Sequence, residues 1–130
     1  MGGNISESSE EDRLPPMTRY VVGLLRRSPH RVETTEAEAS RLQESHLAHL
    51  RHLLEAQELI TCGPLEEDTD LRGILVFRTD SVSLARELMR TDPLIASGRL
   101  ILDTHTWYAP AGLVVRGTPE PPPELTFETD

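Results

Sequence analysis

Three histidines lie three residues apart in one leucine-rich segment, ESHLAHLRHLLEAQELITCGPL, at residues 44 to 65. An imidazole, whose reference pKa is about 6.5, can hold or release a proton near neutral pH, and it can also bind a metal ion. His46, His49 and His52 are therefore candidates for general acid–base catalysis or for metal ligation. Which of them can act depends on where each ring points from the helix that carries it.

The direction of each ring follows from helix geometry, in which every residue advances by about 100°. With His46 set at zero, Leu53 lies at about −20° and Leu50 at about +40°, so His46 falls within an apolar stripe. His49 lies at about −60°, at the border of that stripe, and His52 lies at about −120°, on the side that faces water. The sequence therefore predicts that only His46 points inward.

An inward imidazole can be interpreted in three ways, because an unpaired buried donor costs about 1 to 3 kcal/mol and the ring must have a partner. His46 could be a core histidine that bonds a backbone carbonyl group. It could instead be a general acid–base at the bottom of a pocket between helix and sheet. A metal site is the third possibility, but His46 and His49 supply two ligands at most, so we expect no metal ion.

The elements that must position these rings follow from changes in hydrophobic periodicity. Thr35 with Glu38 three residues later is a capping box at the start of a helix, and Pro93 ends a second helix. The predicted elements are a strand at 19–27, a helix at 34–59, strands at 60–65 and 72–79, a helix at 81–90 and a strand at 99–108. This βαββαβ order predicts an α+β fold with a four-stranded antiparallel sheet and two helices on one face.

The predicted strands are apolar on both faces. Val21 and Leu25 alternate with Val22 and Leu24 in the first strand, and the third strand shows the same pattern. A sheet with one face in water would carry polar residues at every second position. We therefore expect two subunits to pack sheet against sheet in a homodimer, since both predicted helices cover the other face.

Composition limits the possible classes of function. The formal net charge of −9 argues against a nucleic-acid partner, because phosphate binding requires a basic surface. The single cysteine, Cys62, excludes an intramolecular disulfide, and no run of about 18 apolar residues could span a bilayer. The acidic start lacks the pattern of a secretory signal. We expect a cytoplasmic protein that binds neither nucleic acid nor a membrane.

The two ends of the chain differ in composition from its middle. Residues 1–16 are rich in Ser and Glu, and residues 111–130 contain four prolines within positions 119–123. Each end carries four carboxylates and one arginine, a net charge of −3. We expect both to be disordered tails around a single domain at 17–110. The start MGGNIS also matches the N-myristoylation pattern at Gly2, although so short a pattern often matches by chance.

Several motifs occur in an order that resembles the YciI-like (YCII-related) domain family. They are HLAHL, the following GPL, the strand RGILVF, the helix ending in DPLIASGRL and the last strand. The resemblance covers about residues 18 to 110. It implies a ferredoxin-like subunit, a dimeric α+β barrel and a small-molecule enzyme with a catalytic histidine and aspartate. The family includes a dehydrochlorinase.

The resemblance assigns the catalytic pair to two positions. The histidine of HLAHL is His46, and the aspartate is Asp92, in the Asp-Pro that closes the second helix. From the residues alone, Asp92 is also a natural N-cap for the turn at 93–97. Asp68 and Asp70, in the acidic turn at 66–70, are alternative candidates for the catalytic aspartate, although carboxylates in such turns are commonly only solvated charges.

The resulting hypothesis is that His46, oriented by Asp92, moves a proton on a small substrate without a metal or an organic cofactor. The reaction would be an isomerisation, an elimination or a hydrolysis. Gly63, Pro64 and His49 are the candidate substrate-binding residues. The alternative is a non-catalytic small-molecule-binding or regulatory dimer. A sealed site around His46 would favour that alternative, and an open cleft with Asp92 within hydrogen-bond reach would favour the enzyme.

Other residues that could carry chemistry have simpler interpretations. We expect Cys62 to be a small buried filler and not a nucleophile, because no histidine lies near it in sequence. Asp103, His105 and Trp107 share one face of the last strand by alternation, and we expect them at the dimer interface, with a pocket as the alternative. His30 lies in the connection before the long helix and is expected to be a solvated loop residue, with a pocket lid as the alternative.

Overall fold

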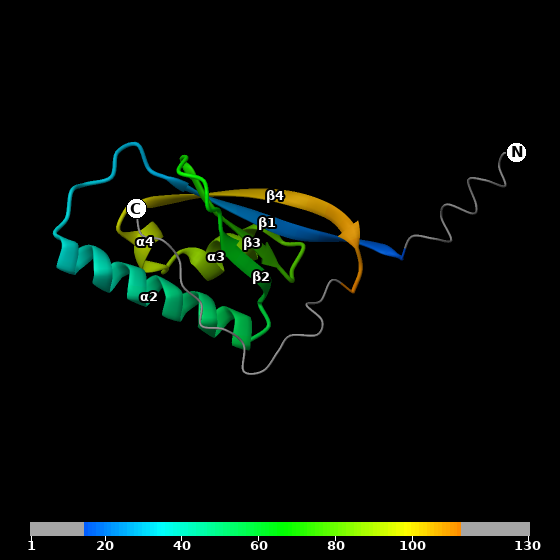
Figure 1. Ribbon diagram of the computed structural model, residues 1–130. Coiled ribbons are helices and arrows are strands. Elements are labelled where there is room, and N and C mark those ends of the chain that lie inside the picture. The colour runs from blue at the N-terminus through cyan, green and yellow to red at the C-terminus, as the bar shows by residue number, and fades with distance from the viewer. Residues whose placement is uncertain (1–14, 113–130) are drawn as a thin grey trace, which may run out of the picture.

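The computed structural model describes residues 15–112. In chain order its elements are β1 (Met17–Arg27), α2 (Glu36–Glu55), β2 (Leu59–Pro64), β3 (Leu71–Phe77), α3 (Val82–Met89), α4 (Pro93–Ala96) and β4 (Leu100–Pro110). This is the predicted βαββαβ order with one addition, the short helix α4 in place of a turn. The three helices lie on one side of the sheet (Figure 1).

The strands form one antiparallel sheet in the order β2-β3-β1-β4, which confirms the predicted ferredoxin-like α+β fold. The long strands β1 and β4 pair over their whole length, from Met17 opposite Pro110 to Arg27 opposite Leu100. Both extend beyond the apolar runs that predicted them, because a backbone ladder needs no apolar side chains to continue. This ladder supports the end of the sheet where β1 leads into the loop before α2.

Helix α2 starts and turns as its sequence indicates. The Thr35 side chain accepts a hydrogen bond from the backbone N–H of Glu38 at 3.1 Å, which is the predicted cap. The buried residues of the helix are His46, Leu50 and Leu53, the three that the rotation places in one stripe. The two leucines lie in the main core between the helices and the sheet. His46 lies on the same face of the helix and therefore also points toward the protein interior.

The face of the sheet that carries no helix within residues 15–112 is also apolar. Tyr20, Val76 and Ala109 form a small buried cluster on this face, with Ile60 packed against it. Ile74 lies on the same face and is 36% exposed. The alternation that predicted two apolar faces is thus present in the folded sheet.

Several predictions concern residues outside the described range or are tested only in part. The disorder expected for most of residues 1–16 and 111–130, and the myristoylation pattern at Gly2, lie outside residues 15–112. Within that range, no helix combines the length and the apolar character that crossing a bilayer requires.

Truncating the stripe next to His46 should destabilise the fold. Leu50 is fully buried one turn after His46, so Leu50→Ala should lower the free energy of unfolding by about 2 to 5 kcal/mol through lost burial and a residual cavity. Leu84 on α3 is 41% exposed, and Leu84→Ala should cost less than about 0.5 kcal/mol. Urea unfolding of both variants measures the difference, and equal losses would contradict the assigned core.

Candidate active site

The candidate site centres on a buried contact between α2 and the segment that precedes α4. Nδ1 of His46 lies 2.7 Å from Oδ1 of Asp92. The exposed fraction of His46 is 2%, and that of Asp92 is 0%. The structure therefore brings together the two residues predicted as a catalytic pair, which are 46 positions apart in the sequence.

Asp92 uses its two carboxylate oxygens for different partners. While Oδ1 contacts His46, Oδ2 accepts hydrogen bonds from the backbone N–H groups of Leu94 at 3.1 Å and Ile95 at 3.3 Å. Asp92 is thus the N-cap of α4, as the Asp-Pro sequence indicates, with Pro93 at the start of the helix. The cap holds the carboxylate in place, so the structural role of Asp92 supports its contact with the imidazole.

The partner of Nδ1 determines how the His46 ring can act. If the Asp92 carboxylate is ionised, it only accepts hydrogen bonds, and Nδ1–H then donates to it. In the neutral ring the proton is then on Nδ1, and Nε2, on the opposite edge, carries the lone pair. A proton taken up at Nε2 would create an imidazolium whose charge lies next to the Asp92 carboxylate. This is the arrangement of an oriented general base.

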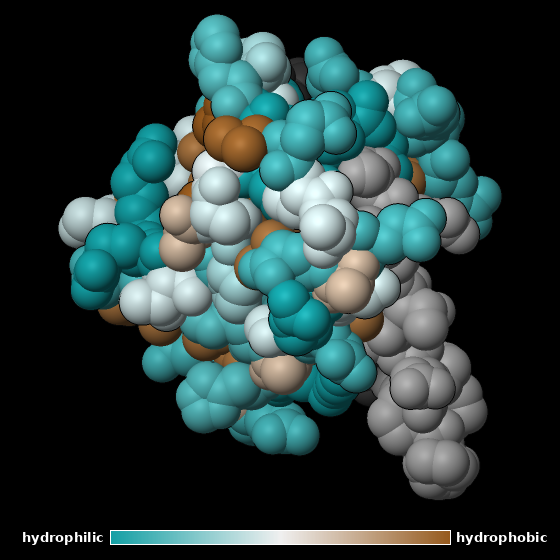
Figure 2. All heavy atoms as spheres, turned by 90° about the vertical axis from the view of Figure 1, so that its left-hand side faces the viewer, coloured by the Kyte–Doolittle hydropathy of each residue, from teal (hydrophilic) through white to brown (hydrophobic). Residues whose placement is uncertain are grey.

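A pocket lies between α2 and the end of the sheet, and His46 forms part of its wall. Its empty space, including the open mouth, is about 580 Å³. Gly63 and Pro64, at the end of β2, line it, and their role in substrate binding stays a prediction. A Cβ built on Gly63 would meet nothing within 4 Å, so the chain leaves open space there. Figure 2 views this end of the molecule, whose surface is largely hydrophilic.

Four polar residues of the pocket wall were not found by sequence reasoning. Gln43 lies on α2, Arg31 in the loop before α2, Arg72 near the start of β3 and Arg99 just before β4. The spacing of Gln43, three residues before His46 on the same helix, could have identified it as a pocket residue. No sequence pattern could have identified the three arginines, because only the arrangement of the strand ends brings them together.

His49 is not among the described residues that line the pocket, and its role in substrate binding stays a prediction. Its Nε2–H donates to the backbone carbonyl of Leu88 at 2.8 Å, so the ring joins α2 to α3. The 60° step from His46 turns the ring toward the neighbouring helix and away from the pocket. His52 is exposed, as predicted.

Asp68 and Asp70, the alternative candidates for the catalytic aspartate, lie at the surface of the protein. The side chains of Asp68 and Asp70 are 93% and 80% exposed, and each lies near Arg27, at 3.4 and 3.7 Å respectively. His30 is exposed in the loop before α2, as expected for a solvated residue. None of these three residues lines the pocket beside His46.

The remaining candidates lie apart from the pocket. Asp103, His105 and Trp107 lie on the helix-free face of β4, and Nε of Arg26 contacts Oδ2 of Asp103 at 2.5 Å. The hydrogen bond from Arg26 lowers the pKa of Asp103, so this carboxylate is charged at neutral pH. Among the described residues, no group of three or more His, Cys, Asp or Glu side chains could hold a metal ion.

The chain was compared with known proteins in three ways. The model of the YCII-related domain family matches residues 21–102, a span that contains both His46 and Asp92. No curated protein matches the chain. Similar solved structures include 5-chloro-2-hydroxyhydroquinone dehydrochlorinase from Burkholderia phenoliruptrix AC1100, in complex with 2,5-dihydroxybenzoquinone. It is 16% identical, covers 67% of this chain and 92% of its own, and has a TM-score of 0.44.

Cys62 should react slowly. It is partly buried against the core, and burial raises its pKa to about 11. At pH 8 the thiolate fraction is then roughly a hundredfold below that of a thiol with a pKa near 9, and alkylation should slow in proportion. Timed iodoacetamide labelling with mass spectrometry of the native protein measures the rate. The urea-unfolded protein is the control, and equal rates in the two states would contradict the burial.

Proposed function

The chain belongs to the YCII-related domain family, and on that basis we propose that it is a small-molecule enzyme in which His46 and Asp92 transfer a proton. The observation that carries the proposal is the 2.7 Å contact between Nδ1 of His46 and Oδ1 of Asp92 at the wall of an open pocket. A histidine that only completes a core would be sealed by hydrocarbon. Here the imidazole, although only 2% exposed, forms part of the wall of a pocket.

The chemistry follows from the state of the ring. Nε2 of neutral His46 would accept a proton from a C–H or O–H group of the bound substrate. Asp92 would stabilise the imidazolium that forms, because its carboxylate already bonds Nδ1. The imidazolium would then return the proton to a different atom of the substrate or to a leaving group. The N-cap bonds to Asp92 keep the pair aligned throughout, so the barrier includes little reorganisation.

Three reaction classes fit this single acid–base pair. Returning the proton to another carbon is an isomerisation, and losing a leaving group as the proton is removed is an elimination. Activating a water molecule for attack on a carbonyl group is a hydrolysis. None of these routes requires a metal ion or an organic cofactor, so the proposed enzyme uses only its own side chains.

A second part of the proposal concerns assembly. The helix-free face holds the buried cluster of Tyr20, Val76 and Ala109, and Ile74 lies on the same face. Exposing a contiguous apolar sheet face to water is unfavourable, so a second copy packed face to face would remove it from solvent. We propose the homodimer that the alternation in the strands predicts, with the pockets on the outer, helix-covered sides.

Replacing the imidazole should remove proton transfer. The assay is exchange of carbon-bound hydrogen for deuterium in D2O, followed by NMR over a panel of cyclic ketones, lactones and chlorinated phenols. His46→Gln should lower the rate for any active compound by about a hundredfold or more, because the general base is lost. Asp92→Asn keeps a capping oxygen but loses the carboxylate, and it should give an intermediate rate.

His52→Gln is the matched control, because His52 lies exposed on the same helix. It should leave the exchange rate unchanged, and urea unfolding of each variant separates lost chemistry from lost folding. If His46→Gln exchanges as fast as the unmodified protein, the proposed role of His46 is wrong. If compounds bind but the unmodified protein exchanges none, the non-catalytic binding module becomes the better interpretation.

The dimer can be tested by placing a charge on the helix-free face. Ile74→Asp would bury a carboxylate in the proposed interface but leave it in water in a monomer, since Ile74 is 36% exposed in the single subunit. Sedimentation velocity at micromolar concentration should show a dimer for the unmodified protein and a monomer for the variant. Glu44→Gln on α2, away from that face, is the control and should remain dimeric. A monomeric unmodified protein would contradict the proposal.

A further inference from the structure

A second side-chain hydrogen bond joins α2 to the segment that carries Asp92. Nε2–H of His49 donates to the backbone carbonyl of Leu88 at 2.8 Å, and Nδ1 of His46 lies 2.7 Å from Oδ1 of Asp92. The two imidazoles are three residues apart on α2, so they are neighbours on the surface of the helix. Their partners, Leu88 and Asp92, are four residues apart. One turn of α2 therefore holds one short stretch of chain, residues 88–92, at two points.

The carbonyl group that His49 binds is made available by the end of α3. Leu88 lies in the last turn of this helix, where carbonyl groups lack donors from the helix itself. In a longer helix the Leu88 carbonyl would accept from the backbone N–H of Asp92, four residues later. That N–H bonds the carbonyl group of Met89 instead, at 3.0 Å. His49 thus takes the place that the Asp92 N–H leaves.

The end of α3 at this point is a condition for both contacts of the Asp92 side chain. Asp92 has an extended backbone, with φ −60° and ψ 130°, and it is the N-cap of α4. If α3 continued, Asp92 would be an interior helical residue, and its Oδ2 would not accept from the N–H groups of Leu94 and Ile95. By bonding Leu88, His49 favours the backbone conformation in which Asp92 caps α4 and contacts His46.

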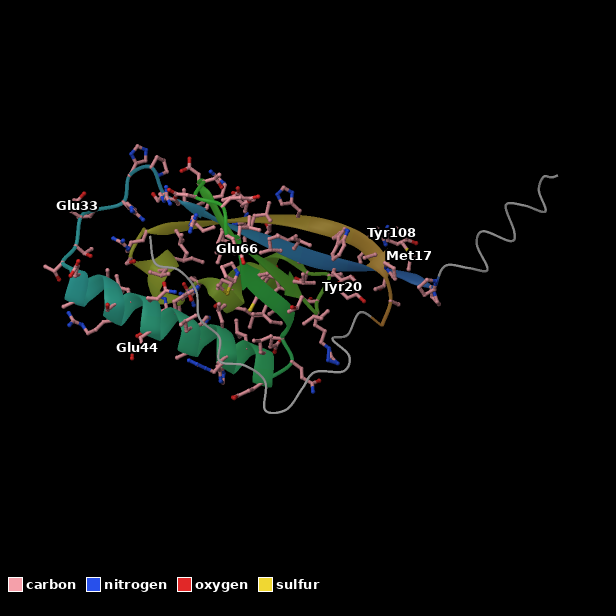
Figure 3. All side chains as sticks on the ribbon, viewed as in Figure 1. Met17, Tyr20, Glu33, Glu44, Glu66 and Tyr108 are labelled. Carbon is pink, nitrogen blue, oxygen red and sulfur yellow. The ribbon has the colours of Figure 1, made fainter. Side chains whose placement is uncertain are left out.

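The two imidazoles lie on the inner side of α2, and the outer side offers control positions. Glu44 points from α2 away from the sheet (Figure 3), and His52 is exposed. His49 is half-buried, while Met89, the neighbour of Leu88, is fully buried in the main core. Core packing therefore holds Met89 without a preferred direction, whereas the hydrogen bond from His49 also fixes the orientation of the Leu88 carbonyl.

We propose that His49 is a positioning residue, which holds the end of α3 so that Asp92 lies within hydrogen-bond distance of His46. Because a backbone carbonyl only accepts hydrogen bonds, neutral His49 carries its proton on Nε2. Neutral His46 carries its proton on Nδ1 if Asp92 is ionised, so the two rings are opposite tautomers on one helix. The structural part of this inference concerns only the contact of His46 with Asp92, whereas its effect on proton transfer rests on the proposed function.

The tautomers can be observed in the unmodified protein without a substrate. Long-range 1H–15N NMR correlations distinguish the protonated nitrogen of each imidazole from the unprotonated one. Neutral His49 should carry its proton on Nε2, and neutral His46 should carry its proton on Nδ1. A neutral His49 protonated on Nδ1 could not donate to Leu88, and this result would overturn the inference by itself.

Two amide side chains that differ in length test the hydrogen bond itself. The amide nitrogen of Gln can replace Nε2 of His49, whereas that of Asn is one methylene shorter and does not reach Leu88. His49→Asn should therefore shift or broaden the Nδ1–H resonance of His46, and His49→Gln should retain it. His52→Asn, on the exposed side of α2, is the control and should leave that resonance unchanged. An unchanged resonance in His49→Asn, or an equal loss in His49→Asn and His49→Gln, would contradict the positioning role.

Hydrogen exchange in the compound panel separates this inference from the proposed function. For any active compound, His49→Asn should lower the rate at saturation by about tenfold and leave the half-saturating concentration nearly unchanged, because a misplaced base affects the transition state. His49→Gln should restore the rate. If His46→Gln loses exchange while His49→Asn keeps both the exchange rate and the His46 resonance, only the positioning role is wrong. If His49→Asn alters the His46 resonance but His46→Gln exchanges as fast as the unmodified protein, only the acid–base role is wrong.

Discussion

The buried contact between His46 and Asp92 is the constraint on which the rest of the site depends. Both groups are removed from water, and breaking such a pair by removing one partner typically costs about 3 to 5 kcal/mol. The contact joins the middle of the longest helix to the start of the shortest one. It therefore determines how α2 lies over the end of the sheet, and with it the position of one wall of the pocket.

The structural role of Asp92 is compatible with its proposed chemical role. One carboxylate oxygen caps α4, and the other holds the imidazole. A residue that only capped a helix would be expected at the surface, where water competes for the same donors. Because Asp92 is fully buried, its carboxylate oxygens find their hydrogen-bond partners within the protein, and the imidazole of His46 is one of them.

The two faces of the sheet carry different features. The helix-covered face holds the main core and, at one end, the pocket with its three arginines. The helix-free face holds a smaller apolar cluster and the pair of Arg26 with Asp103. The proposed reaction and the proposed assembly would therefore use opposite sides of the same strands, so a dimer would leave the pockets open.

The sequence by itself determined the order of elements, the cap at Thr35 and the inward direction of His46, because helix and strand periodicity and capping are local properties. It also placed Asp92 at the start of a turn, although only family resemblance paired it with His46. Tertiary structure decided that contact, the turn of His49 toward Leu88, and the meeting of Arg31, Arg72 and Arg99. These depend on how distant strand ends and helices pack, and no local pattern encodes the distance between residues far apart in the chain.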